Sequence, residues 1–407
     1  MVKNIKISMI ALALLGTSAM ASDSVKFNAG GQAKIYYQTV EDSGDAKLFD
    51  QESSRANIGL QLDLGADFKN GFAFGSQINY LGTLGLEKNL VGNTMQDVGN
   101  KVGSEGLSDD IYLSQIHLSK KFGNTLVKLG RQELPQSLSP LAYSEDWNVF
   151  TNTFDAGVVI NSDIPNTTVV AAYVGKANYN DFGSDMATYG NLTTSVAEVD
   201  GAAYMLTVQN KSCEHATVTG TYYSLDNVAG IVDAHGLWGD VAFNNKQLPL
   251  GLNFGLQAGA ILVDHNLDDT KAFGLKANMK PTSELDLTFA YTSVNDGVVA
   301  MKNTGGITTP LYTQMVVNQG GIELDSDTIM VKGAYDLKGN GTVIAQASMS
   351  SNGDFAAQKD LIEADLAYVA KVSDVDVLAA VVHQSWDAPV DAVDSQNIVR
   401  VVASYKF

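Results

Sequence analysis

Several things that the 407-residue sequence lacks narrow the classes of protein that it can encode. Cysteine occurs once, at Cys213, so the chain cannot form an internal disulfide. Apolar residues make up 45% of the chain, too few for a bundle of membrane helices, each of which needs about 20 nearly uninterrupted apolar residues. Bases are scarce as well: 26 lysines and arginines face 45 acidic residues, and the net charge of −19 argues against nucleic acid as a partner.

The first 21 residues have the features of a secretory signal. Lys3 and Lys6 give a positive start, residues 7–15 are mostly apolar, and Ala19 and Ala21 are the small residues that a signal peptidase reads. We expect cleavage after Ala21, so that residues 22–407 form the mature protein. Its net charge is then −21, because the removed segment holds two lysines and no acidic residue.

In the mature part of the chain, apolar residues recur at every second position. Ile58, Leu60 and Leu62, for example, alternate with residues such as Gln61 and Asp63. Strand side chains point alternately to opposite faces, so this pattern predicts a strand with one apolar and one polar face. The same alternation recurs in residues 252–262, 285–293 and 362–370.

The length of these segments favours a membrane. They run for about 10 to 13 residues, whereas soluble strands more often have five or six and tilted membrane strands about 9 to 11. Their polar face is rich in Gly, Gln, Asn, Asp and Thr. We therefore predict a barrel whose polar face lines a water-filled lumen and whose apolar face contacts lipid, for which a mean hydropathy of −0.01 is normal.

The links between predicted strands alternate between short turns and longer loops. Turn-forming residues mark eight short links, near residues 69–71, 123–124, 163–166, 210–212, 244–249, 280–283, 338–341 and 373–374. Nine longer links are expected near residues 40–54, 82–109, 134–153, 177–198, 225–229, 264–270, 295–324, 351–359 and 387–395. These 17 links predict an all-β, closed antiparallel barrel of 18 strands, with short periplasmic turns and long extracellular loops. Sixteen strands is the alternative.

The chain ends on a strand with one apolar face that closes with Tyr405 and Phe407. An aromatic last residue resembles the signal that outer-membrane proteins present to the barrel-insertion machinery. We therefore predict that Tyr405 and Phe407 form this assembly signal, and that lipopolysaccharide and outer-membrane lipid surround the barrel. A core edge strand that happens to end in phenylalanine is the alternative.

The third long loop, about residues 134–153, differs from the others in composition. It contains Pro135 and Pro140 and several apolar residues, among them Leu141, Trp147 and Phe150. These residues suggest a loop packed inside the barrel, where it narrows the pore.

The charges near this loop are all of one sign. No lysine or arginine occurs between Gln132 and Gly175, and rings of charge select ions by sign. We predict a negative constriction, with Arg131 as the nearest base. The candidate constriction and selectivity residues are Arg131, Glu133, Glu145, Asp146 and Asp155, and further lumen-facing candidates are Lys34, Arg55, Asp63 and Asp67. Two alternatives remain: Glu145 and Asp146 sit idle on an exposed loop tip, and Arg131 forms a wall salt bridge with Glu133 or Asp155.

This region resembles the Campylobacter-type major outer-membrane porins and, more distantly, the basic-amino-acid channels of pseudomonads. The resemblance lies in residues 129–134 (LGRQEL), 140–142 (PLA) and 145–147 (EDW), and the signal peptide, length, strand count and terminal Phe407 agree with it. The resemblance implies a homotrimer whose third loop folds into the pore.

We predict a cation-preferring porin for passive diffusion of ions and small hydrophilic solutes. The alternatives are a substrate-selective channel for amino acids or organic acids, and a non-conducting adhesin or binding barrel. No enzyme motif occurs, and the five histidines show no local zinc spacing. We expect no cofactor, although acidic stretches such as Asp264, Asp268 and Asp269, or Glu323, Asp325 and Asp327, suggest weak calcium binding as an alternative to solvated loops.

Overall fold

A computed structural model describes residues 25–99, 109–193, 201–228, 232–244, 248–264, 266–353, 359–387 and 393–407. The predicted signal peptide, residues 1–21, lies outside these residues. Within them, no helix has the length and apolar character needed to cross a membrane. The three helices described are single 3-10 turns, Leu86–Lys88, Pro249–Gly251 and Gln319–Gly321.

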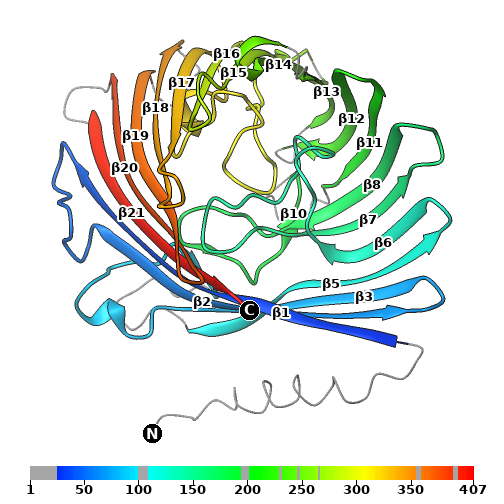
Figure 1. Ribbon diagram of the computed structural model, residues 1–407, viewed down its shortest axis with the longest axis horizontal. Coiled ribbons are helices and arrows are strands. Elements are labelled where there is room, and N and C mark those ends of the chain that lie inside the picture. Colours follow the sequence, from blue (N-terminus) through cyan, green and yellow to red (C-terminus); the bar gives the residue numbers. More distant parts are fainter. Residues whose placement is uncertain are drawn as a thin grey trace, which may run out of the picture.

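The strands form one closed antiparallel ring (Figure 1). The main sheet has 19 strands, but the two-residue β10 (Gly190–Asn191) only pairs with the end of β8, so 18 strands make the wall. They are β1 (Val25–Asp42), β2 (Ser54–Phe68), β3 (Phe72–Gly82), β5 (Asp110–Phe122), β6 (Thr125–Gln132), β7 (Phe154–Asn161), β8 (Thr167–Ala177), β11 (Ala203–Cys213), β12 (Ala216–Val228), β13 (Val232–Asn244), β14 (Asn253–Val263), β15 (Thr270–Met279), β16 (Leu285–Val294), β17 (Ser326–Asp336), β18 (Thr342–Asn352), β19 (Lys359–Val372), β20 (Val375–Asp387) and β21 (Ser395–Lys406). The last strand pairs with the first, so no edge is left open.

The alternation of apolar and polar residues in the sequence corresponds to the alternation of outward-facing and inward-facing side chains in the barrel wall. In β11, Leu206 and Val208 are 47% and 42% exposed on the outside, whereas Thr207 between them is fully buried inside. In β2 and β3, Gln61 pairs with Asn79 and Asp63 pairs with Gln77, on the inner face. The outer face carries the large exposed apolar side chains, which is the surface that a bilayer covers.

The strand ends confirm 18 strands and most of the predicted links. Two links were placed too early, because residues 210–212 belong to β11 and residues 225–228 belong to β12. Eight short turns separate pairs such as β2 and β3, where Gly71 takes a positive φ of 83° that favours glycine. The long connections open at the other end of the barrel. Four of them are used below: loop 2 (residues 83–109), loop 3 (residues 133–153), loop 4 (residues 178–202) and loop 7 (residues 295–325).

Several of the long loops fold into the barrel interior, whereas the sequence predicted only loop 3 there. Figure 1 shows coil lying inside the ring of strands. Buried apolar residues from loop 2, loop 3, loop 4 and loop 7 share one cluster: Met95, Val98, Trp147, Val149, Phe150, Met186 and Val317. A short parallel pairing of β4 (Gln96–Asp97) with β9 (Ser184–Asp185) also joins loop 2 to loop 4. The lumen is therefore narrowed by a packed layer of loops.

Candidate functional site

Loop 3 is seated on the barrel wall through a glycine. Phe150 is buried, and its ring lies where a Cβ on Gly59 of β2 would stand, 2.6 Å from Cζ. A neighbouring amide network fixes the backbone of the loop. Gln96 of loop 2 receives a hydrogen bond from the Phe150 N–H at 2.9 Å and donates one to the Phe150 carbonyl at 2.7 Å. Loop 3 is thus held both by the barrel wall, through Gly59, and by loop 2, through Gln96.

Glu145 joins loop 3 to loop 7. Its side chain is buried, and its carboxylate accepts four hydrogen bonds from loop 7. The donors are Asn303 Nδ2 at 2.9 Å, the Ile307 N–H at 3.0 Å, the Thr308 N–H at 3.1 Å and Thr308 Oγ1 at 2.5 Å. Hydrogen bonds to an ionised acceptor are stronger than neutral ones, so this junction is firm.

Glu363 joins loop 7 to the wall in the same way. This fully buried carboxylate on β19 accepts the N–H groups of Val316 and Val317 at 2.9 and 3.1 Å. Gln384 of β20 donates to its other oxygen at 2.6 Å. Loop 7 therefore spans the lumen between two carboxylates, one from loop 3 and one from the wall.

Below this layer lies a cavity of about 930 Å³. It is roofed by loop 3 and loop 7 and walled by inward residues of β11 to β15. Lys276 of β15 lies 4.1 Å from the ring centre of Tyr312, whose hydroxyl donates to Asp240 at 2.5 Å. Burial and the adjacent Asp240 raise the pKa of the Tyr312 hydroxyl, so it stays a neutral donor. This lower cavity presents both signs of charge, with Lys211 and Asp146 also on its surface.

A second cavity of about 460 Å³ lies on the β1, β20 and β21 side of the interior. Arg55, Asp181, Lys302 and Glu323 contribute its charges. Lys302 Nζ lies 3.9 Å from a Glu323 oxygen, and burial raises the pKa of that carboxyl while Lys302 opposes the shift. The charged groups of this cavity are also of both signs.

The predicted constriction residues lie in four different environments. Asp146 is the one whose side chain is largely exposed, at 78%, and it forms an ion pair with Lys34 on the inner face of β1 at 3.3 Å. Glu133 receives hydrogen bonds from Gln115 and Thr151, each at 3.0 Å. Glu145 is not on an exposed tip: its carboxylate is bound by the four donors of loop 7, and the residue borders the lower cavity.

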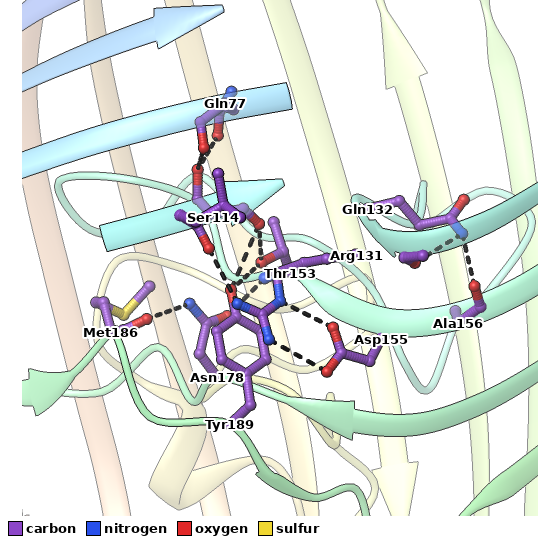
Figure 2. Close-up of polar contacts among 12 residues, drawn as sticks. Gln77, Ser114, Arg131, Gln132, Thr153, Asp155, Ala156, Asn178, Met186 and Tyr189 are labelled. Carbon is purple, nitrogen blue, oxygen red and sulfur yellow. Dashed lines mark hydrogen bonds and ion pairs between the residues drawn. The ribbon is translucent and has the colours of Figure 1, made fainter. Parts of the chain in front are cut away.

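Arg131 and Asp155 lie in the wall, in the salt bridge that was one of the two alternatives. Arg131 Nε and Nη2 donate to the two Asp155 oxygens at 2.8 and 3.2 Å, and Nη1 donates to the Leu113 carbonyl at 3.0 Å. Figure 2 shows this pair beside Tyr189, whose ring centre is 3.3 Å from the guanidinium carbon. The register of β5 with β6 ends at Ile116 and Arg131, so the arginine fills the place where loop 3 leaves the wall.

The remaining lumen candidates, Arg55, Asp63 and Asp67, lie on the inner face of β2, and their part in permeation stays a prediction. Arg55 lines the second cavity and donates to the Thr94 carbonyl of loop 2 at 3.3 Å. Asp63 accepts a hydrogen bond from Gln77 at 2.8 Å, and Asp67 accepts one from Asn28 at 2.9 Å. At the chain end, the rings of Tyr405 and Phe407 stack 6.2 Å apart and are half exposed. Their part in barrel assembly stays a prediction.

The sequence reasoning missed Glu363, Asn303 and the insertion of loop 7. A signal was present, because residues 295–325 contain apolar Met301, Leu311, Met315, Val317 and Ile322, and all five are buried. Among the residues that the structure describes, no three His, Cys, Asp or Glu side chains converge to hold a metal ion. Of the acidic stretches considered for calcium, Asp327 accepts a hydrogen bond from Tyr291, and Asp269 lies 4.0 Å from Lys271.

No protein-family model matches the sequence, and no curated protein matches it. Solved structures do match its fold. Pseudomonas aeruginosa OccK8 (OprE) is 14% identical with a TM-score of 0.72, and the match covers 94% of this chain and 98% of that one. P. aeruginosa OccK2 (OpdF) in complex with glucuronate is 14% identical with a TM-score of 0.69, over 94% and 98%. P. aeruginosa OpdK with vanillate is 12% identical with a TM-score of 0.72, over 94% and 98%.

These similar structures are Pseudomonas aeruginosa proteins, whereas the sequence motif resembles the Campylobacter-type porins. At these identities the likeness concerns the fold. It covers 94% of this chain and therefore includes nearly the whole closed ring of strands. The chain is thus an 18-stranded antiparallel β-barrel with the fold of outer-membrane porins, whose strands cross the outer membrane repeatedly.

Proposed function

We propose that the protein is a channel for passive diffusion of ions and small hydrophilic solutes, with a weak preference for cations. The observation that carries this proposal is the two-sided wall combined with a packed layer of loops. An 18-stranded barrel is too wide for wall side chains to fill, so its lumen holds water. Loop 3 and loop 7 narrow that water path and so limit the size of the solute.

The charges facing the lumen support the cation preference. Asp146 is exposed beside the lower cavity, and the Asp240 carboxylate lies on its wall. The lower cavity is lined by Glu145, Asp146 and Asp240 against Lys211 and Lys276, and the second cavity has two charges of each sign. The excess of negative charge is small, and we therefore expect a modest preference.

Neutralising Asp146 should weaken this preference. A unit charge about 5 Å from a permeating ion contributes about 0.8 kcal/mol in a water-like dielectric, a factor of about 4 in local cation concentration. We expect D146N to lower the cation-to-anion permeability ratio by roughly two- to fourfold, measured as the reversal potential in a planar bilayer under a KCl gradient. D163N, which removes an exposed carboxylate from the turn after β7, is the matched control and should change little. A wild-type reversal potential favouring chloride would overturn the cation preference.

The preference should also depend on pH through Glu133. Burial is the main cause that raises the pKa of this carboxyl above its ordinary value, and Asp63 and Asp146 add to it, while Thr151 and Lys128 oppose it. Glu133 therefore takes up a proton at a higher pH than an ordinary glutamate and loses its negative charge early on acidification. We expect the wild-type reversal potential to begin to fall at a pH above the one at which an ordinary glutamate is protonated, and E133Q to remove this early part of the fall. An identical curve for E133Q would exclude Glu133 from the ion path.

A substrate-selective channel for small carboxylates is the second candidate. Lys276 and Lys211 lie on the lower cavity without any ion pair described for them, and the ammonium of Lys276 lies over Tyr312. Glucuronate and vanillate, the compounds bound in two structures of this fold, are both carboxylates. Selective passage would appear as a saturable flux of a carboxylate in liposome swelling, whereas an unselective pore would rank solutes by size alone.

Kinship with the Campylobacter-type porins and assembly into a trimer remain proposals based on the sequence resemblance. The described outer surface is apolar around the ring, and a lipid bilayer would cover it as well as a neighbouring copy would. Mass measurement of the detergent-solubilised protein with the bound detergent subtracted would distinguish one copy from three. Binding of lipopolysaccharide and recognition of Phe407 by the insertion machinery are proposed on the same basis.

A further inference from the structure

The environment of Glu145 is that of a bound carboxylate ligand. All four groups that hold it are neutral donors, two backbone N–H groups, one amide and one hydroxyl. Among the described residues, Glu145 forms no ion pair with a lysine, arginine or histidine. The sequence around it, from Gln132 to Gly175, also contains no lysine or arginine. Such a set of convergent neutral donors binds a carboxylate by geometry and hydrogen bonding, without a counter-ion.

The backbone of loop 7 is shaped to admit this group. Gly306 precedes the two N–H donors, and a Cβ at that position would stand within 2.4 Å of the Glu145 carboxylate oxygens. Glycine therefore leaves the space that the carboxylate fills. Glu145 and Thr308 also lie on the surface of the lower cavity, so a solute that has reached this cavity is next to the site.

We propose that Asn303, Gly306, Ile307 and Thr308 form a carboxylate-binding site that the chain fills with its own Glu145, and that a solute carboxylate competes for it. This inference rests on the proposed channel function. When the solute carboxylate takes the four donors, Glu145 is released and loop 3 parts from loop 7. The site thereby couples the presence of a carboxylate solute to the width of the constriction.

The entering group and the displaced group are both carboxylates, so each can accept the same hydrogen bonds from the four donors. The internal carboxylate has the advantage of its tether, which gives it a local concentration of about millimolar or above. A free carboxylate must exceed this concentration to displace it in the wild-type protein. Once the Glu145 side chain is removed, the same donors should accept a carboxylate at a lower concentration.

Glu363 supplies the contrast. It also accepts two N–H groups of loop 7, but it is fully buried on β19 and lines neither the lower nor the second cavity. Two of its donors, Val317 and Gln384, line the second cavity, but Glu363 itself lines neither cavity, so we take it as a fixed anchor. The half of loop 7 around Val316 and Val317 stays on the wall while the half around Thr308 moves.

Chemical rescue tests the proposal. In a planar bilayer, E145A should give a larger and noisier single-channel current in chloride than the wild-type protein. In E145A, acetate fills the space that the missing Glu145 carboxylate leaves between loop 3 and loop 7, and it displaces no side chain. Replacing chloride by acetate at constant ionic strength should therefore restore the small, quiet current of this variant in a saturable manner. E145A combined with N303A and T308V should lose the acetate response, because two of the four donors, the only two that are side-chain groups, are gone.

E363A is the matched control. Its current should also rise, since the anchor of loop 7 is lost, but acetate should not reverse the change. An unchanged E145A current in acetate, or equal rescue of E363A, would overturn the proposal and leave the channel function intact. If neither the wild-type protein nor any variant conducts, the channel function itself is wrong. In the wild-type protein, the noise should increase with acetate at concentrations above those that rescue E145A.

Discussion

Replacing Gly59 by valine should open the channel. The inner face of β2 has a gap in its side chains at this glycine, and Phe150 of loop 3 fills it: a Cβ there would come within 2.6 Å of the ring and 3.2 Å of Val149. Both loop residues are buried, so neither can turn away without disturbing its neighbours. Adding bulk to a packed contact of this kind costs about 1–3 kcal/mol, and lifting loop 3 from the wall is the simplest relief.

The expected result of G59V is a single-channel conductance raised roughly twofold or more, because the lumen of an 18-stranded barrel is wide once the loop has moved. Loop 3 should also become accessible to protease in the folded, detergent-solubilised protein. G220V is the matched control: Gly220 also lies within a strand, on β12, but nothing lies within 4 Å of its Cβ position, and the added side chain would face outward. If G59V conducts like the wild-type protein, loop 3 is not the element that narrows the pore.

The wall was readable from the sequence because membrane strands impose a strict period of two. Each alternating segment became a strand, and most predicted turns and loops fall between strands, whereas the links predicted at residues 210–212 and 225–229 lie two to three residues too early in the chain. The inner position of Asp63 and Asp67 followed from the same alternation. Strand length and turn-forming residues are local properties, so they can be recognised in a single sequence.

The constriction was less readable, because its contacts join distant segments. Asn303, Ile307 and Thr308 follow Glu145 by about 160 residues, and two of the bonds involve backbone N–H groups that any residue would supply. The sequence around Glu145 does not distinguish it from Asp146. Yet the Glu145 carboxylate is buried against loop 7, whereas the Asp146 carboxylate is exposed beside Lys34. For Arg131 the sequence offered two roles, and the geometry of the wall places it in the salt bridge with Asp155.

The salt bridge between Arg131 and Asp155 should contribute strongly to the stability of the barrel. The Arg131 guanidinium closes the wall where β6 gives way to loop 3, by binding the Leu113 carbonyl, both Asp155 oxygens and the face of Tyr189. Beside it, Thr153 Oγ1 donates to the Ser114 carbonyl at 2.8 Å (Figure 2). These backbone carbonyls have no β6 partner, so side chains must satisfy them.

R131M keeps much of the bulk of the side chain and removes every one of these donors. The Leu113 carbonyl and the Asp155 carboxylate then lose this partner. An unsatisfied buried group costs about 1–3 kcal/mol, and the cost is reduced here because both groups are partly exposed. We expect the heat-induced shift of the folded band on a denaturing gel to occur several degrees lower than in the wild-type protein. K271M is the matched control, because Lys271 forms an exposed pair with Asp269 at 4.0 Å, and such pairs contribute about 0–1 kcal/mol. An equal loss in both variants would mean that the position of Arg131 in the wall has no special weight, whereas an R131M-specific loss with unchanged ion selectivity would assign Arg131 to the wall and exclude it from the pore.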